Sequence, residues 1–405
     1  MSALAIDGGT PVRTTPMPSW PAIGAEEIAA AEQVLRSNRI NYWTGEECKH
    51  FEAEYATSVG REHGIALANG TLALELALRA FGIGPGDEVV VPARTFIATA
   101  SAAVAVGAVP VVADIEPDSG NITADTLEAV LTQRTRAVIP VHVGGWPVDM
   151  APIVSLAEKS GLVVIEDCAQ AHGADRDGTP VGNLGSHAAA FSFCQDKIVP
   201  LGEGGMLVLD DHDAFERAWA YKDHGKSLDK LLEARASTDT AAFRWLVEGF
   251  GSNWRMPEVI GAMGRASLRK LPDWHQARVA NATALTEGIR GLPGLSVPTP
   301  SPEAEHGYYR LHGRVRPELL KDGWSRTRIL SAIAAEGVPC QYGTCAEIYR
   351  EPAFAAAGLG PSERLPVASA FHETCFALFT HPTLGPQELA DTIAAVRKVM
   401  ESAAR

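Results

Sequence analysis

Between residues 71 and 208 the chain alternates short apolar runs with helix-like segments, and Gly and Pro residues separate the two. This alternation is typical of strands that lie in a mainly parallel sheet, each followed by a crossover helix and buried on both faces. We expect crossover helices at 98–106, 123–131 and 152–160. The expected strands are 88–91, 109–113, 137–141, 162–166, 189–193 and 206–209.

Residues 227–254 lose this alternation. A helical stretch then opens near Asn253-Trp254-Arg255-Met256 and runs towards Leu271. From about Pro272 onward, helical patterns at 327–336 and 386–401 are separated by short strand-like pieces. A chain of 405 residues is long for one core. We therefore expect a large α/β domain with an N-terminal arm at 1–250 and a smaller α+β domain at 251–405.

The net charge of the chain is relevant to whether it binds nucleic acids. The chain holds 35 Lys and Arg against 49 Asp and Glu, a formal net charge of -14, and has no Lys/Arg-rich run. This balance opposes binding to the phosphate backbone of nucleic acids. It does not oppose an anionic small molecule, because a helix N-terminus binds phosphate locally. We expect no nucleic acid partner.

Neither a membrane span nor a secretion signal is expected. The most apolar long stretch, 102–113, contains Gly107 and Pro110 and is too short to cross a bilayer. The first residues lack a basic region followed by a long apolar core. The six cysteines are too sparse for a disulfide framework. We expect a cytoplasmic protein with reduced cysteines.

Two residues that follow expected strands indicate a chemistry. Asp167 ends the apolar run 162–166, and Lys197 follows the run 189–193. An amine that can form a Schiff base, near a carboxylate that can keep a pyridinium nitrogen protonated, is what a pyridoxal phosphate site requires. Either residue alone is ordinary, since surface lysines are common and a buried carboxylate needs only some cationic partner.

Other residues near the same sheet edge could complete such a site. Gly70 and Thr71 open a helical pattern, where free backbone amides favour an anion, although Thr71 alone reads as an ordinary helix cap. Ser192 could donate to a phosphate. Phe96 could lie flat against a planar ring, although alone it reads as a core residue. Gln170 follows Asp167 out of the same strand.

The order of these fragments resembles the DegT/DnrJ/EryC1/StrS family of sugar and cyclitol aminotransferases. The resemblance covers nearly the whole chain and implies the fold-type I architecture of aspartate aminotransferase, with a mainly parallel mixed sheet flanked by helices. The fragments are Asp7-Gly8-Gly9-Thr10-Pro11-Val12-Arg13, Ala68-Asn69-Gly70-Thr71, Val91-Pro92-Ala93-Arg94-Thr95-Phe96, Pro140-Val141-His142, Glu166-Asp167-Cys168-Ala169-Gln170, the Lys197 segment and Asn253-Trp254-Arg255-Met256.

The resemblance implies a role for each matched residue. Lys197 would hold pyridoxal 5'-phosphate as a Schiff base, and Asp167 would hold the pyridinium nitrogen. The remaining cofactor contacts would be Gly70, Thr71 and Ser192 at the phosphate, Phe96 against the ring, Gln170 near the ring oxygen, and Asn253 reaching the phosphate of the neighbouring subunit. The resemblance therefore implies a homodimer with shared active sites.

The substrate contacts are less defined. The resemblance implies transfer of an amino group from glutamate or glutamine to a keto sugar or keto-cyclitol. Arg255 is a candidate for the donor carboxylate, although an interface ion pair is as good a reading. His142 and His172 could line the pocket, although structural histidines are commoner. Cys168 and His172 have metal-ligand spacing but no third ligand, so no metal is expected.

Two alternatives stay open. A 3-amino-5-hydroxybenzoate synthase, which eliminates and aromatises on the same scaffold, would share these motifs and give a product that absorbs in the near ultraviolet. A non-catalytic sensor that binds pyridoxal phosphate would share the cofactor site, although no DNA-binding module is visible in the chain. A branch of the family that removes hydroxyl groups replaces the lysine with His, whereas this chain keeps Lys197.

Overall fold

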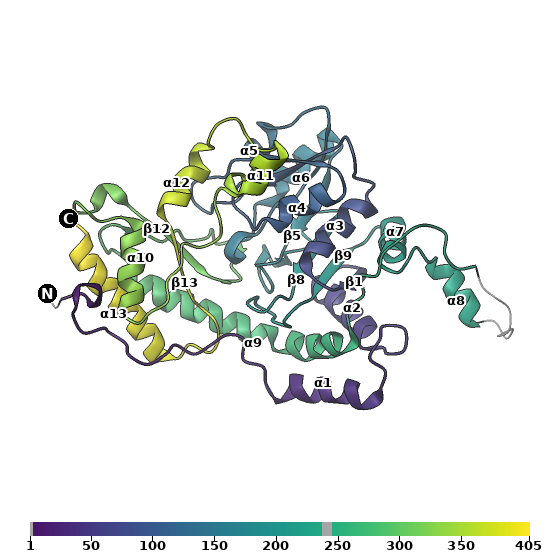
Figure 1. The fold of residues 1–405 in the computed structure, drawn as a ribbon, viewed down its shortest axis with the longest axis horizontal. Coiled ribbons are helices and arrows are strands. Elements are labelled where there is room, and N and C mark those ends of the chain that lie inside the picture. Colours follow the sequence, from purple (N-terminus) through teal and green to yellow (C-terminus); the bar gives the residue numbers. More distant parts are fainter. Residues whose placement is uncertain (1–2, 237–244) are drawn as a thin grey trace.

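The computed structural model describes residues 3–236 and 245–405, and a seven-stranded sheet forms its centre (Figure 1). Strand β9 runs antiparallel to both of its neighbours, whereas the pairs among β8, β5, β4, β2 and β3 are parallel. In spatial order the strands are β1 (His63–Leu67), β9 (Gly205–Leu209), β8 (Ala188–Ser192), β5 (Val163–Asp167), β4 (Thr135–Val138), β2 (Glu88–Pro92) and β3 (Val109–Ala113). The mainly parallel mixed sheet expected from the sequence is confirmed.

Helices cover both faces of this sheet because successive strand residues point to opposite sides. In β2, Val89 and Val91 pack with α3 (Gly70–Ala80) and α4 (Ala98–Ala105), whereas Val90 packs on the other side with α6 (Met150–Ser160). On that second side Ala66 of β1 packs with α2 (Glu47–Ser58). Helix α7 (His212–Lys222) joins α3 on the first side. Both faces are therefore dry, which explains the continuous apolar runs.

The helix expected at 123–131 is shorter in the structure. Helix α5 spans only Ala124–Glu128, where the Thr123 hydroxyl accepts from the backbone N–H of Thr126. The chain then turns, and the backbone N–H of Thr132 donates to the hydroxyl of Thr135 at the start of β4. Threonine hydroxyls in this segment therefore accept hydrogen bonds from backbone N–H groups, which in a longer helix would donate to backbone carbonyls.

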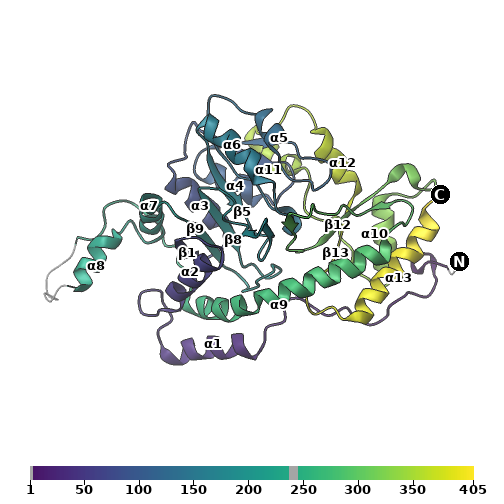
Figure 2. The ribbon, with the colours of Figure 1, turned by 180° about the vertical axis from the view of Figure 1, so that it is seen from behind.

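The helix expected to end near Leu271 continues well beyond it, so this prediction was wrong. Helix α9 spans Glu258–Ile289 and passes through Pro272. A proline lacks the N–H that the helix interior uses, but this helix is packed along its length. Helix α1 (Ala25–Ser37) and α2 pack on it, and further along it contacts α13 (Pro386–Ala403). Figures 1 and 2 show α9 running beneath both halves of the molecule.

A second core lies at the end of the molecule that carries both termini (Figure 1). It is built on a three-stranded sheet of β10 (Leu295–Ser296), β12 (Leu311–Val315) and β13 (Cys375–Leu378), covered by α10 (Arg326–Ala335) and α13. The N-terminal segment belongs to this core. Leu4 is buried in it, and the backbone amides of Ala5 and Val12 donate to the carboxylate of Glu336.

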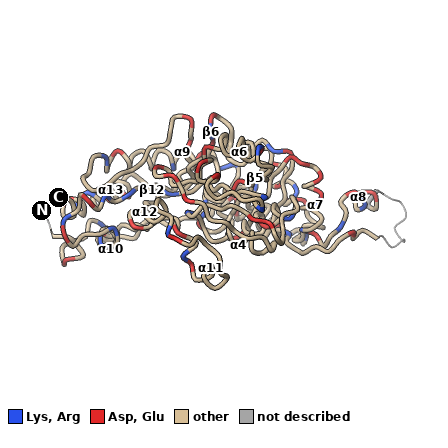
Figure 3. Tube along the Cα trace, turned by 90° about the horizontal axis from the view of Figure 1, so that it is seen from above, with Lys and Arg blue, Asp and Glu red and all other residues tan. Residues whose placement is uncertain are grey.

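The remaining elements are short or peripheral. Helix α8 projects away from the rest of the molecule next to the residues that are not described (Figure 2). These elements are α8 (Leu228–Ala236), α11 (Pro352–Ala357), α12 (Pro366–Thr374), β6 (Asp175–Arg176), β7 (Thr179–Pro180), β11 (Ala304–Glu305) and the 3-10 turns Ala5–Asp7, Val143–Gly145, Pro317–Leu319 and Ile348–Arg350. None of the described helices is both long and apolar enough to cross a membrane. Basic and acidic residues are interspersed along the chain (Figure 3).

Candidate active site

Four of the residues expected in the cofactor site lie where strands of the central sheet end. Gly70 follows β1, Phe96 follows β2, Asp167 ends β5 and Ser192 ends β8. These strands all run in the same direction, so their carboxyl ends meet at one edge. In open α/β sheets this edge is where ligands bind. The structure therefore brings these four residues to one place, as the sequence predicts.

Asp167 is a buried carboxylate that only a few protein groups contact. Its Oδ2 accepts from the hydroxyl of Thr99 at 2.9 Å, and its Oδ1 accepts from the backbone N–H of Ala169 at 3.2 Å. Burial raises the pKa of Asp167, and the bonds from Thr99 and Ala169 and the charge of Lys197 act against that rise. The carboxylate thus has need of a further cationic hydrogen-bond donor.

Lys197 lies in the turn that follows β8 and is partly buried. Its backbone N–H donates to the carbonyl of Cys194, and its carbonyl accepts from the indole N–H of Trp20 at 2.8 Å. Its Nζ lies 5.0 Å from the centre of the Tyr309 ring. Lys197 follows β8, which pairs with β5, the strand that ends at Asp167, and the charge of Lys197 acts to lower the pKa of that carboxyl. The expected pair therefore shares one site.

The start of α3 forms a tight cradle at the same edge. Asn69 caps the helix, since its Oδ1 accepts from the backbone N–H of Leu72 at 3.0 Å. The neighbouring Thr71 is exposed, so it is not the cap that its type alone would predict. A Cβ on Gly70 would stand 2.7 Å from the Cβ of Ser192. The absence of a side chain at Gly70 lets the helix start approach β8.

Gln170 and Phe96 have environments suited to a ligand. The Oε1 of Gln170 accepts from the backbone N–H of Gly144 at 2.7 Å and from the hydroxyl of Thr344 at 3.3 Å. This fixes the side-chain carbonyl and leaves the amide N–H groups to donate elsewhere. Phe96 is 65% exposed, which is unusual for a large apolar side chain beside a buried sheet edge. A ring stacked on Phe96 would cover that apolar surface.

These groups together fit pyridoxal phosphate. The site offers an amine for the aldehyde, a buried carboxylate for the pyridinium N–H, and a helix N-terminus with nearby hydroxyl groups for the phosphate. The cradle at Gly70 would be filled by any larger residue. The donor set is therefore the one that this cofactor requires.

Asn253 and Arg255 lie on the segment that precedes α9. Asn253 is exposed and its backbone bridges to Asp223. The Nη1 of Arg255 lies 2.6 Å from Oδ1 of Asp223, whose side chain is buried and which also binds Lys226 at 2.9 Å. The guanidinium of Arg255 is therefore already matched by a carboxylate. Its contacts favour the ion-pair reading over the expected role with a donor.

The two candidate pocket histidines are both buried and fully hydrogen-bonded. His172 accepts from the hydroxyl of Tyr55 through Nδ1 and donates to the carbonyl of Ser192 through Nε2. Nδ1 of His142 accepts from the backbone N–H of Val148, and its Nε2 donates to Glu166. No ring nitrogen of either residue is left for a substrate. His172 instead holds the backbone of Ser192 in place.

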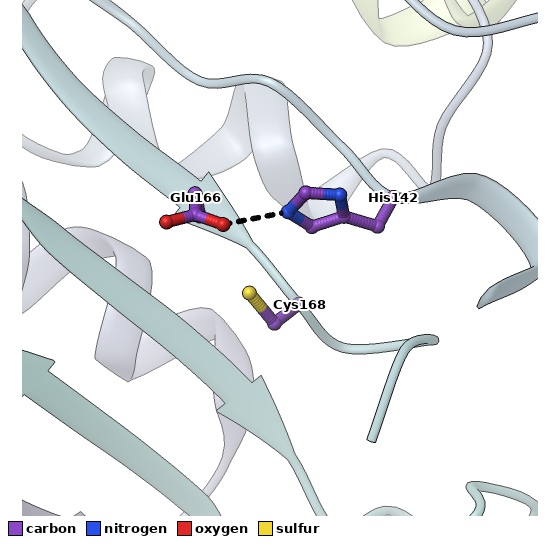
Figure 4. Close-up of side chains that lie close together, drawn as sticks. All are labelled: His142, Glu166 and Cys168. Atoms are coloured by element: carbon purple, nitrogen blue, oxygen red, sulfur yellow. Dashed lines mark hydrogen bonds and ion pairs between the residues drawn. The ribbon is translucent and has the colours of Figure 1, made fainter. Parts of the chain in front are cut away.

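His142, Glu166 and Cys168 form a cluster whose ligand atoms all lie within 4.8 Å of one another (Figure 4). The oxygens of Glu166 accept from four donors, which are Nε2 of His142, the hydroxyl of Ser186 and the backbone amides of Gly182 and Leu184. Burial alone would raise the pKa of Glu166, but the hydrogen bond from His142 and the others lower it. Burial raises the pKa of the Cys168 thiol well above its usual value. Such a saturated carboxylate beside a protonated thiol is a structural network beneath the sheet edge.

The family model of the DegT/DnrJ/EryC1/StrS aminotransferase family matches residues 21–397 of the chain. The chain belongs to this family. It is an aminotransferase, as the motifs predicted. A solved structure of an aminotransferase from Psychrobacter cryohalolentis has a TM-score of 0.92 and 44% sequence identity, covering 96% of this chain and 99% of that chain. The expected fold-type I architecture is therefore confirmed.

Two curated relatives each match more than four fifths of the chain. The dTDP-3-amino-3,4,6-trideoxy-alpha-D-glucose transaminase of Streptomyces venezuelae is 35% identical over 387 residues, covering 95% of this chain and 94% of the relative. The L-glutamine:2-deoxy-scyllo-inosose aminotransferase of Streptomyces fradiae is 34% identical over 347 residues, covering 84% and 81%. The family members that this chain is similar to thus include enzymes named for a sugar and for a cyclitol.

Sequence reasoning missed three residues of this site. Thr99 holds the Asp167 carboxylate, Tyr309 lies against Lys197, and Trp20 binds the Lys197 backbone. Tyr309 and Trp20 lie 112 and 177 residues from Lys197 along the chain, so no local pattern connects them to it. Thr99 had a signal, because it lies one helical turn after Thr95, at the edge where Phe96 was expected.

Proposed function

We propose that this aminotransferase holds pyridoxal phosphate on Lys197 and moves an amino group from glutamine or glutamate to a keto sugar or keto-cyclitol. The observation that carries the proposal is the buried carboxylate of Asp167, which accepts from Thr99 and Ala169 and ends the strand that pairs with β8, after which Lys197 follows. Burial raises the pKa of this carboxyl, so its charged form needs a cationic hydrogen-bond donor. A pyridinium N–H would be such a donor.

When bound, pyridoxal phosphate supplies an electron sink that stabilises negative charge at the α-carbon of the amino donor. In the proposed site Asp167 accepts a hydrogen bond from the ring N–H, and Thr99 keeps the carboxylate oriented. The N-terminus of α3 and the hydroxyls of Thr71 and Ser192 bind the phosphate. Phe96 packs on the ring, and the amide of Gln170 donates near the ring oxygen.

Lys197 has two tasks in this proposal. Its Nζ is the covalent attachment point, and once the donor amine takes its place, the free amine removes the proton from the donor α-carbon. Trp20 and the turn at Cys194 fix the Lys197 backbone, so that only the side chain moves between these tasks. In the second half reaction Lys197 would carry a proton the other way, from the cofactor to the ring carbon of the keto substrate that receives the amino group.

The substrate class rests on the relatives. One is named for a dTDP-linked amino sugar and another for glutamine and a deoxy-inosose, and each extends over more than four fifths of this chain. Glutamine is accordingly our first choice of donor. The keto acceptor is proposed to be a ring ketone carrying several hydroxyl groups.

A two-stage experiment tests this function on the purified full-length protein. The cofactor-loaded enzyme should show a visible absorption band, and glutamine or glutamate should bleach it. Keto sugars and keto-cyclitols should then restore the band. Lys197→Ala should lose turnover, while Arg316→Gln, on the exposed surface, should keep it. Turnover retained without Lys197 would refute the assignment.

The 3-amino-5-hydroxybenzoate synthase reading stays as the second candidate from the sequence. An elimination and aromatisation would release a product that absorbs in the near ultraviolet without consumption of an amino donor. The same reactions followed in the ultraviolet separate the two activities. Donor consumption without such a product supports transamination.

Three further predictions from the sequence are part of this proposal. We propose a homodimer in which Asn253 reaches the phosphate of the neighbouring subunit, supported by the exposure of Asn253 between partly buried neighbours. We propose the division into 1–250 and 251–405, with the N-terminal arm crossing to the second core through Leu4 and Val12.

A cytoplasmic location stays a prediction of the sequence.

A further inference from the structure

A pocket of about 270 Å³ lies next to the Lys197 turn. The N-terminal segment forms one wall through Trp20, the second core forms another through Arg310 and Phe379, and Asp196 closes it on the side of the turn. The lining residues are Met17, Pro18, Ser19, Trp20, Asp196, Arg310, Val338, Pro339, Phe379, His381, Leu384 and Thr392. Most of this lining is apolar, so the charged residues in it stand out.

Arg310 is the cation that lines this pocket. Its residue is 8% exposed, and its guanidinium carbon lies 4.2 Å from the centre of the Tyr309 ring and 4.6 Å from that of Phe379. Its Nη1 donates to the carbonyl of Tyr309 at 2.8 Å. Its nearest carboxylate is that of Asp196, which is 3.7 Å away, half exposed, and bound to the Tyr309 hydroxyl. Arg310 is therefore loosely paired at best.

A second guanidinium lies close behind it. Arg278 of α9 is completely buried and donates through Nη1 to the carbonyls of Tyr308 and Tyr309. Its Nε and Nη2 have no hydrogen-bond partner among the described residues. Burial, and then the charge of Arg310, lower the pKa of Arg278 to about 9. Two neighbouring cations in a dry place are costly unless an anion joins them.

The position next to Lys197 indicates which anion. Nζ of Lys197 and the guanidinium of Arg310 both lie against the Tyr309 ring, at 5.0 Å and 4.2 Å from its centre. In an α-amino acid the carboxylate is one carbon away from the nitrogen that reacts, so its binding site must be near that amine. A planar guanidinium matches a carboxylate with two parallel hydrogen bonds.

We infer that Arg310, supported by Arg278, is the binding site for the α-carboxylate of the amino donor. This inference rests on the proposed function and replaces Arg255, whose guanidinium is bound to Asp223. On binding, the donor carboxylate displaces the loose contact with Asp196, and the stacked Tyr309 and Phe379 rings keep the guanidinium in place. Arg278 sets the charge of the pocket without touching the donor.

The donor half reaction tests this inference without a known keto substrate. The cofactor-loaded enzyme is mixed with glutamine at rising concentration, and the rate of bleaching gives the concentration for half-maximal rate. Arg310→Gln should raise that concentration roughly 10- to 100-fold, the range expected for loss of a hydrogen bond to a charged group. Arg310→Lys, which keeps the charge but not the planar fork, should raise it less. Arg316→Gln, which breaks only an exposed pair with Glu318, is the matched control and should change nothing.

A donor without the carboxylate separates binding from structure. The α-amide of glutamine should be a poor donor for the parent enzyme, and Arg310→Gln should handle the amide and the acid equally. If the variant still discriminates between acid and amide as the parent does, the inference is overturned. If Arg310→Gln does not fold, the same comparison with Arg310→Met, which also removes the charge, decides. If no donor bleaches the parent enzyme, the proposed function itself fails, which is a different result.

Discussion

At the scale of single residues, burial decides how Asp167 can act. Its carboxylate has two protein donors, Thr99 and the amide of Ala169, and a raised pKa. Asn in its place would keep the shape but lose the negative charge that attracts a pyridinium N–H. We expect Asp167→Asn to slow the donor half reaction by about 10- to 100-fold, the loss of one charged hydrogen bond. Stopped-flow absorbance measures this, and an unchanged rate would contradict the role.

His172 gives a second prediction at this scale, concerning pH. Burial lowers its pKa to about 4 from an ordinary 6.5. Because this pKa is depressed in the folded state, His172 costs no stability above pH 6.5, where its imidazole is neutral in both the folded and the unfolded chain. As the pH falls towards 4, the unfolded chain binds a proton that the folded chain refuses, so stability is lost. At 1.36 kcal/mol per pKa unit, the whole effect is about 3 kcal/mol.

The matched measurement is urea denaturation of the parent protein and of His172→Gln at several pH values between 7 and 4.5. Glutamine can still donate to the carbonyl of Ser192 but does not titrate. We expect the variant to have a smaller loss of unfolding free energy as the pH falls. His212→Gln, at an exposed histidine, is the matched control for removal of an imidazole. Equal slopes for all three proteins would show that His172 is not the titrating group.

At the scale of elements, the close approach of α3 to β8 shapes the phosphate cradle. Gly70→Ala would place a Cβ 2.7 Å from the Cβ of Ser192 and 3.2 Å from the carbonyl oxygen of Phe191. We expect the helix start to shift and the affinity for pyridoxal phosphate to fall by roughly 10-fold or more, since such overpacking costs about 1–3 kcal/mol. Titration of the apoenzyme with the cofactor measures this. Gly84→Ala, whose Cβ would come no closer than 3.7 Å to other atoms, should bind as the parent does.

The elements also show what a sequence can and cannot predict. The buried parallel strands were predicted well, because both faces of the sheet are covered and the strands read as continuous apolar runs. The direction of β9 was not, because a buried strand has the same composition whichever way it runs. The end of α9 was misjudged at Pro272, since packing of α1, α2 and α13 stabilises the helix beyond it. Tertiary contacts override a local signal there.

The residues of the candidate site likewise fall into those with a local sequence signal and those that only tertiary contacts bring together. Residues at the carboxyl ends of strands, such as Asp167 and Ser192, could be predicted, because parallel strands bring these ends to one edge of the sheet. Tyr309 and Arg310 come from the second core and meet Lys197 only through the fold. Arg255 was an attractive cation in the sequence, but its partner Asp223 lies 32 residues away and could not be inferred. Ion pairs between residues far apart in the chain could not be predicted from the sequence.

At the scale of the whole molecule, sharing of sites between subunits makes a quantitative prediction. Lys197→Ala and Asn253→Asp should each be inactive, the second because a carboxylate would face the phosphate. In an equal mixture that exchanges subunits, half of the dimers are mixed and each holds one intact site, so about a quarter of the parent activity should return. Lys197→Ala and Asp167→Asn both change residues that one subunit contributes to the site, so a mixture of these two variants should gain nothing beyond the residual activity of Asp167→Asn. No recovery in the first mixture would contradict a shared site.

The bond between Lys197 and the cofactor is central to the proposed function. The most direct measurement is reduction of the cofactor-loaded protein with borohydride, followed by proteolysis and mass spectrometry of the peptides. We predict a single peptide that carries the reduced pyridoxal phosphate adduct, with the label on Lys197. An adduct on another lysine, or no adduct after full reconstitution, would contradict the assignment.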